Sequence, residues 1–275
     1  MPGWDGWTSS GELSRGVIHM DISLRDRFIG LWQEYFPGAE LPVTFELTED
    51  DRGVERAPAP NGWRCIVCDL ARVRRGKSLV FTQESLSCSG AKYYMGFVKG
   101  RAPDFRYFLS CGKPGSVRGE RYKKNPEIVD ELVQKGTFLP AGSRHYLFSR
   151  WDNLNPDDNP DVVIFFARAE VIAGLFTLAN FDRAEPHGVI CPFGSGCSSI
   201  IHYPLHEGMA ECPRAVLGMF DPSARPCVPV DMLTMAIPMR LFGQIVESME
   251  ESFLITDTWE KVKKRIEMSE PRNPR

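Results

Sequence analysis

The residues of this chain most able to do chemistry are its eight cysteines. They fall into two groups, one in each half of the chain: Cys65, Cys68, Cys88 and Cys111, then Cys191, Cys197, Cys212 and Cys227. A Cys-x-x-Cys pair such as Cys65 and Cys68 places two sulfurs within reach of one ion, and cysteines at longer spacing can complete a four-coordinate site. The sequence therefore predicts thiolate chemistry.

An iron–sulfur cluster is the leading expectation. One set of ligands would be Cys65, Cys68, Cys88 and Cys111, and another Cys191, Cys197 and Cys212. Proline after Cys191 and Cys212 stiffens the loop, and the glycines before Cys197 let backbone N–H groups approach the sulfides. We expect a cluster of the [4Fe-4S] type that serves electron transfer or cluster-dependent catalysis on a small molecule.

Two other readings of the same cysteines remain open. Zinc accepts sulfur and nitrogen, so a mixed site could form from Cys191, Cys197, His202, His206 and Cys212, although Pro204 disfavours a regular helix that presents both histidines. Alternatively, Cys65-x-x-Cys68 is a dithiol redox motif with a helix after it. Neither reading decides whether the protein is an enzyme.

Anion contacts are a further expectation, and they would suit a metal-free binding module as well. The candidates are Lys77 and Lys92, near the first cysteines, and Ser223 and Arg225, in a loop after an expected strand. A solvated helix face is the alternative for the basic residues. Gly76-Lys77-Ser78 is not a phosphate loop, because it would end a helix instead of beginning one.

The whole chain has 275 residues, of which 43% are hydrophobic and 25% charged, and its net charge is −3. There is no basic excess, so we do not expect nucleic acid as a partner. No stretch approaches the ~18 apolar residues of a membrane span, and the first residues lack a secretory signal, so we expect a cytoplasmic protein. In a reducing cytosol four disulfides are disfavoured. A small molecule or a redox protein is the expected partner, and a homo-oligomer is left open.

Hydrophobic periodicity predicts the α/β class, with a mixed α+β arrangement as the variant. Helices are expected over 21–36, 68–75, 88–97, 125–136, 169–180, 239–253 and 259–268, and strands over 41–47, 79–81, 161–166, 215–220 and 233–237. The strand at 161–166 and the helix after it form half of a βαβ unit. We expect an N-terminal arm over 1–17, one domain over 18–268 and a disordered tail over 269–275.

Several segments resemble the domain of unknown function 169 family of archaeal and bacterial proteins. They are the run from Cys68 to Ser78, the run from Cys88 to Phe97, the strand at 160–166, Gly196 to Ser199, the segment 216–225 and Ala236 to Phe242. The family pattern carries onto Cys68, Cys88 and Cys197, which are therefore the ligands expected first. Met219 stands where relatives can have cysteine, and the resemblance implies no defined activity.

The two halves of the chain also look alike in outline. Each runs through a strand, a helix and a cysteine toward a serine-containing turn, which suggests an internal pseudo-duplication in which Cys68 and Cys197 are counterparts.

Overall fold

The structure is a computed structural model that describes residues 22–141, 143 and 145–269. The expected N-terminal arm and nearly all of the expected tail lie outside the described residues.

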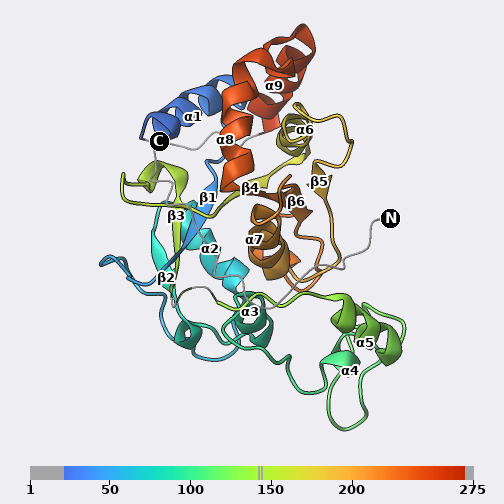
Figure 1. Ribbon diagram of the computed structural model, residues 1–275. Helices are drawn as coiled ribbons and strands as arrows, with labels where there is room; N and C mark the ends of the chain where they lie inside the picture. Colours follow the sequence, from blue (N-terminus) through green and yellow to red (C-terminus); the bar gives the residue numbers. More distant parts are fainter. Residues whose placement is uncertain (1–21, 142, 144, 270–275) are drawn as a thin grey trace.

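One mixed sheet runs through the described chain in the order β2-β3-β1-β4-β7-β6-β5 (Figure 1). Its strands are β1 (Val43–Thr48), β2 (Leu79–Phe81), β3 (His145–Arg150), β4 (Val162–Ala167), β5 (Val189–Ile190), β6 (Ala215–Gly218) and β7 (Leu233–Pro238). All neighbours pair antiparallel except β5 and β6. Because β4 and β6 both run opposite to β7, β4 and β5 point the same way, and α6 (Ala169–Leu178) makes the expected crossover between them.

Strand β4 is central and fully buried, and its residues alternate between two hydrophobic cores. Val163 and Phe165 face the core that contains Trp32 and Phe242, whereas Val162 and Ile164 face the other. A strand covered on both faces shows a continuous apolar run instead of alternation, which explains the sequence Val-Val-Ile-Phe-Phe-Ala.

Helices cover both faces of the sheet (Figure 1). The first core is closed by α1 (Ile22–Tyr35), α6, α8 (Met239–Ser248) and α9 (Asp257–Ser269). The second is closed by α2 (Ile66–Arg74), α3 (Ser89–Tyr94), a π-helical turn (Ser198–His202) and α7 (Tyr203–Gly208). A lobe that carries α4 (Phe105–Phe108) and α5 (Pro126–Lys135) extends from this second layer.

The predicted mixed α/β class is confirmed, and each expected helix and strand has a counterpart. The strands β3 and β5 and the short helices α4 and α7 were not predicted. The helix expected over 239–253 is interrupted, because α8 ends at Ser248 and is followed by two short 3₁₀ turns, Met249–Glu251 and Phe253–Ile255. Within the described ranges, no helix is both long and apolar enough to cross a bilayer.

Candidate functional site

Cysteines from both halves of the chain meet on the second core, around the N-terminal end of α2. Cys65, Cys88 and Cys227 pack against the cluster that contains buried Cys197. The charges of Cys65 and Cys88 each raise the pKa of Cys197, and the charge of Cys88 raises the pKa of Cys65. These three thiols therefore lie close enough to interact electrostatically. We call Cys65, Cys68, Cys88, Cys197 and Cys227 the cysteine centre. Three of its members were the ligands expected first from the sequence.

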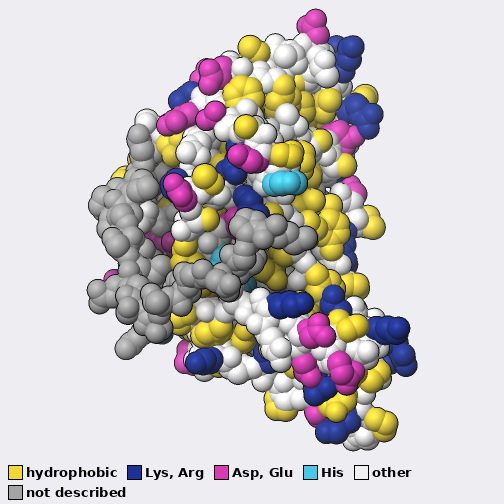
Figure 2. Space-filling model, turned by 45° about the vertical axis from the view of Figure 1, so that its right-hand side comes forward, with side chains coloured by type: hydrophobic (Ala, Val, Ile, Leu, Met, Phe, Trp, Pro, Cys, Tyr) yellow, Lys and Arg dark blue, Asp and Glu magenta, His cyan; other side chains and the backbone are white. Residues whose placement is uncertain are grey.

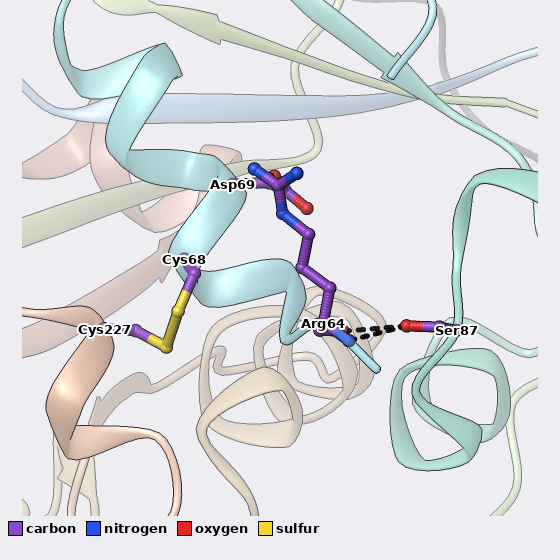
Figure 3. The surroundings of a disulfide bond; sticks show 5 residues. All are labelled: Arg64, Cys68, Asp69, Ser87 and Cys227. Carbon is purple, nitrogen blue, oxygen red and sulfur yellow. Dashed lines mark hydrogen bonds and ion pairs between the residues drawn. A yellow bond between two sulfur atoms is a disulfide. The ribbon is translucent and has the colours of Figure 1, made fainter. Parts of the chain in front are cut away.

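A disulfide joins Cys68 to Cys227 (Figure 3). Cys68 lies in the first turn of α2, and Cys227 ends a 3₁₀ turn (Arg225–Cys227) in the loop between β6 and β7. The bond spans 159 residues of sequence and holds the two Cα atoms 4.6 Å apart. Cys68 is exposed and Cys227 half-buried, so solvent and other thiols have access to the bond. The sequence disfavoured a set of four disulfides and did not predict this single one; in this state Cys68 is not available as a metal ligand.

Two hydrogen bonds between the backbone of Arg64 and the side-chain hydroxyl of Ser87 place Cys65 beside Cys88. The N–H group of Arg64 donates to Ser87 Oγ over 2.7 Å, and the Ser87 hydroxyl donates to the Arg64 carbonyl over 3.3 Å. Figure 3 shows this contact between the residues that precede the two cysteines. Cys65 is the N-cap of α2 and Cys88 the N-cap of α3, so two helix starts face the same centre. Helix N-termini favour thiolate.

Burial sets the ionisation of the free thiols. Desolvation raises the pKa of Cys65, and the backbone N–H groups of Val67 and Cys68 act in the opposite direction. Desolvation raises the pKa of Cys197 much further, since that side chain is buried and only the Ser195 hydroxyl lowers its pKa. Burial thus favours the protonated form of Cys65 and Cys197, and a bound cation would act in the opposite direction.

Asp221 borders the centre on the side of the disulfide loop. One carboxylate oxygen accepts a hydrogen bond of 3.1 Å from the Gly196 N–H, and the other accepts from the Ser223 N–H and hydroxyl. Its charge raises the pKa of both Cys65 and Cys197. A Cβ on Gly196 would lie 2.6 Å from the Ala224 side chain, so glycine is needed where the π-helical turn meets this loop.

A buried histidine ends the π-helical turn that begins at Cys197. π-Helical turns occur frequently at functional sites. His202 is 3% exposed, its Nδ1 atom has no hydrogen-bond partner in the described structure, and burial lowers its pKa to about 4. Its ring packs edge-on against Tyr94, whose hydroxyl accepts a hydrogen bond of 3.3 Å from Arg101. Tyr94 also interacts electrostatically with Cys197, so this polar group borders the cysteine centre.

The remaining cysteines are not part of the centre. Cys111, Cys191 and Cys212 are exposed free thiols, and Cys111 lies in the turn after α4. Among the described residues, no three histidines, cysteines or acidic residues are grouped so that they could hold a single metal ion. The sequence grouped the expected ligands by half of the chain, whereas the structure combines cysteines of both halves in one centre.

The expected anion contacts are scattered. Lys77 follows the C-terminal end of α2, about 15 Å along the helix from Cys65 by the helical rise. Lys92 lies on α3, and Ser223 is bound to Asp221. The Arg225 guanidinium donates to the carbonyls of Met219, Pro229, Val230 and Met232, all in its own loop. Arg225 thus holds the path of this loop, and its assignment as an anion contact stays a prediction.

Sequence reasoning missed Cys227, Asp221 and the group formed by Tyr94, Arg101 and His202. Cys227 looked isolated because its partner lies far away along the chain. The one local signal for this loop was its turn-rich sequence from Asp221 to Pro229, which marks an irregular backbone and not a partner.

Comparisons with known proteins give a family and no activity. Neither a search of curated proteins nor a search of solved structures found a match. The model of the domain of unknown function 169 family, described as an uncharacterised ArCR, matches residues 39–248. This range contains the whole cysteine centre and most of the chain. The chain belongs to the domain of unknown function 169 family.

Proposed function

We propose that the protein is a thiol–disulfide redox protein whose working group is the Cys68–Cys227 bond. The observation that carries this proposal is that an accessible disulfide lies three residues from a free thiol at the start of the same helix. Exposed disulfides are more often labile, catalytic or regulatory than purely structural ones. The Cys65-x-x-Cys68 spacing lets the two sulfurs react with each other.

The burial of the two residues, Cys68 exposed and Cys227 half-buried, suggests the direction of attack. A substrate thiolate attacks the exposed Cys68 Sγ, the Cys68–Cys227 bond breaks, and Cys227 leaves as a thiolate that takes a proton from solvent. The mixed disulfide on Cys68 is then resolved by Cys65, which expels the substrate thiolate and forms a Cys65–Cys68 bond. A second route is attack of another substrate thiol on the substrate sulfur, which releases Cys68. In that route two thiols lose two electrons and two protons to the protein.

Trapping tests the proposal. The protein is equilibrated with dithiothreitol buffers from oxidising to reducing, then alkylated and mapped by mass spectrometry. We expect Cys68 and Cys227 to change state together in one two-electron transition without denaturant. With glutathione, a monothiol that cannot cyclise to release Cys68, Cys65→Ser should accumulate the mixed disulfide on Cys68, while Cys111→Ser, a change at an exposed cysteine outside the centre, should not. The proposal fails if the pair stays reduced in every buffer or reacts only after unfolding.

An iron–sulfur cluster on the same centre is the second candidate. Cys65, Cys88 and Cys197 each precede a helix or helical turn, and they come from three separate segments. Desolvation is the largest effect on the ionisation of Cys197 and raises its pKa, and a bound metal is a group that would convert this buried thiol into a thiolate. Reduction of the disulfide would release Cys68 and Cys227 as further ligands.

Metal analysis distinguishes the two candidates. Protein purified without oxygen and with a reductant is assayed for iron, acid-labile sulfide and zinc, and its visible spectrum is recorded. Iron and sulfide in near-equal amounts, lost in Cys88→Ser and Cys197→Ser but kept in Cys111→Ser, would support the cluster. Stoichiometric zinc would support the zinc-stabilised alternative, and protein free of metal leaves the thiol mechanism.

A further inference from the structure

Positive charge is concentrated in one segment of a chain that is acidic overall. Residues 99–124 contain eight Lys and Arg but two Asp and Glu, which gives this segment a charge of +6 while the whole chain carries −3. In Figure 2, dark blue side chains appear across the lower lobe, where Figure 1 places α4 and α5. An uneven charge distribution of this kind creates a directed field at the surface.

Most of these cations are not neutralised within the protein. Arg106 pairs with Glu127 and Asp130 of α5, and Lys113 pairs with Asp104. The other six have no acidic partner in the part of the chain that the structure describes: Lys99, Arg101, Arg118, Arg121, Lys123 and Lys124. Lys99, Arg118, Arg121 and Lys124 are exposed. We call residues 99–124 the basic segment.

The basic segment contacts the loop that carries the disulfide. Burial and the charge of Asp221 raise the pKa of Tyr122, and hydrogen bonding with Ser223 opposes them, so the phenol lies beside these two residues. Asp221 in turn binds the Gly196 N–H next to Cys197. Lys123 lies 3.8 Å from the centroid of the Phe193 ring, in the segment that leads to Cys197. The basic segment therefore lies, at Tyr122 and Lys123, next to the two segments that carry Cys227 and Cys197.

We infer that the basic segment docks a partner protein that presents a cysteine within an acidic surface, and so selects the substrate of the Cys68–Cys227 bond. This inference rests on the proposed thiol–disulfide function and adds the chemical class of its partner. A cleft of one charge raises the local concentration of opposite charge and the association rate by about 10–10³-fold, in a manner that depends on salt.

A protein partner fits these observations better than nucleic acid. The phosphates of a nucleic acid could bind the unpaired cations of the basic segment, but a nucleic acid has no group that reacts with a disulfide. The chain outside the basic segment is acidic, which limits the length of a phosphate backbone that could lie along the surface. An acidic protein surface that carries a reactive thiol uses both the cations and the disulfide beside them.

Charged peptides of defined sequence test the inference. Three short peptides with one central cysteine, flanked by aspartates, serines or lysines, are used to reduce the oxidised protein. Each rate is divided by the rate of the same peptide with an uncharged disulfide reagent, because flanking charges change the reactivity of the thiol itself. At about 20 mM salt we expect the acidic peptide to react at least about tenfold faster than the neutral one, and at about 300 mM salt the ratio should approach one.

Charge reversal locates the effect. Lys99→Glu, Arg118→Glu and Lys124→Glu, combined in one variant, should abolish the preference for the acidic peptide. The matched control combines Lys77→Glu, Lys261→Glu and Lys264→Glu, which changes the net charge equally at exposed positions away from the basic segment, and it should keep most of the preference.

The outcomes separate this inference from the function on which it rests. If no peptide reduces the disulfide, the thiol–disulfide function fails. If all three react at equal normalised rates, or if both triple variants lose the preference equally, docking at the basic segment is wrong and the function stands. If a short DNA oligonucleotide binds the basic segment while the acidic peptide gains no rate, the assignment to a protein partner is overturned.

Discussion

Cys68 and Cys227 tie the first turn of α2 to the loop between β6 and β7, across 159 residues of sequence. The bond joins the two halves of the chain at the surface of the second core. Its neighbour Cys65 begins the same helix but keeps its thiol. One helix start thus holds an oxidised and a reduced cysteine, which is the arrangement that thiol exchange requires.

The bond should contribute measurably to stability. Closing a loop of this length restricts the unfolded chain, and loss of a native disulfide typically costs about 2–5 kcal/mol. We expect the double variant Cys68→Ser and Cys227→Ser to lower the free energy of unfolding in urea by an amount in this range under oxidising conditions. Cys111→Ser should have little effect, and with dithiothreitol the wild type should fall to the level of the double variant. Equal stability of all three proteins in oxidising buffer would contradict the presence of the bond in solution.

The free thiols should differ in reactivity according to burial. Iodoacetamide modifies thiolate, so the raised pKa of Cys65 slows its alkylation at neutral pH and moves the rise in rate to more alkaline pH. Cys197 should resist alkylation until the protein unfolds, because it is buried and its pKa is raised further. Mass spectrometry at a series of pH values measures both rates, with exposed Cys212 as the internal reference. Alkylation of Cys197 in the folded protein at the rate of Cys212 would show that the centre is open.

Local patterns of sequence predicted elements well and their contacts poorly. The buried strand β4 and the amphipathic helix α8 carry their periodicity in consecutive residues, so both were found. Of the three free thiols that meet, Cys88 and Cys197 were expected together through the family resemblance, whereas Cys65 was grouped with Cys88 as part of one expected ligand set. The link from Cys68 to Cys227 depends on how the sheet brings β7 next to β4, and no feature of either segment encodes that neighbour.

The sequence predicted the position of Arg225 but not its contacts with the backbone. Arg225 was correctly placed in a loop after a strand, where α/β proteins bind ligands. Whether a guanidinium in such a loop binds a ligand or the backbone depends on the path of the loop. Here the path turns four carbonyl groups toward Arg225.

Buried His202 should make stability fall in mild acid. Its pKa is about 4 in the folded protein and about 6.5 in an unfolded chain, so the unfolded state binds the proton first as the pH falls. Between about pH 6.5 and pH 4 the free energy of unfolding should decrease, by up to about 3 kcal/mol from this group. Urea titrations at pH 7 and pH 5 measure the slope. His202→Gln should reduce the pH dependence and His187→Gln, at an exposed position, should preserve it; equal slopes in both variants would assign the effect elsewhere.

Loss of the Arg225 guanidinium should release the loop that carries Cys227. Arg225→Ala removes hydrogen bonds to four carbonyl groups, which we expect to lower the free energy of unfolding by about 1–3 kcal/mol. It should also speed reduction of the disulfide by dithiothreitol severalfold, because a looser loop exposes the half-buried Cys227 sulfur. Arg225→Lys should resemble Arg225→Ala, since one ammonium group cannot reproduce the planar set of donors. Arg118→Ala, which removes an exposed arginine that is not ion-paired, serves as the control. An anion contact at Arg225 would give a different result, namely unchanged reduction kinetics with weaker binding of inorganic phosphate, and that result would support the assignment made from the sequence.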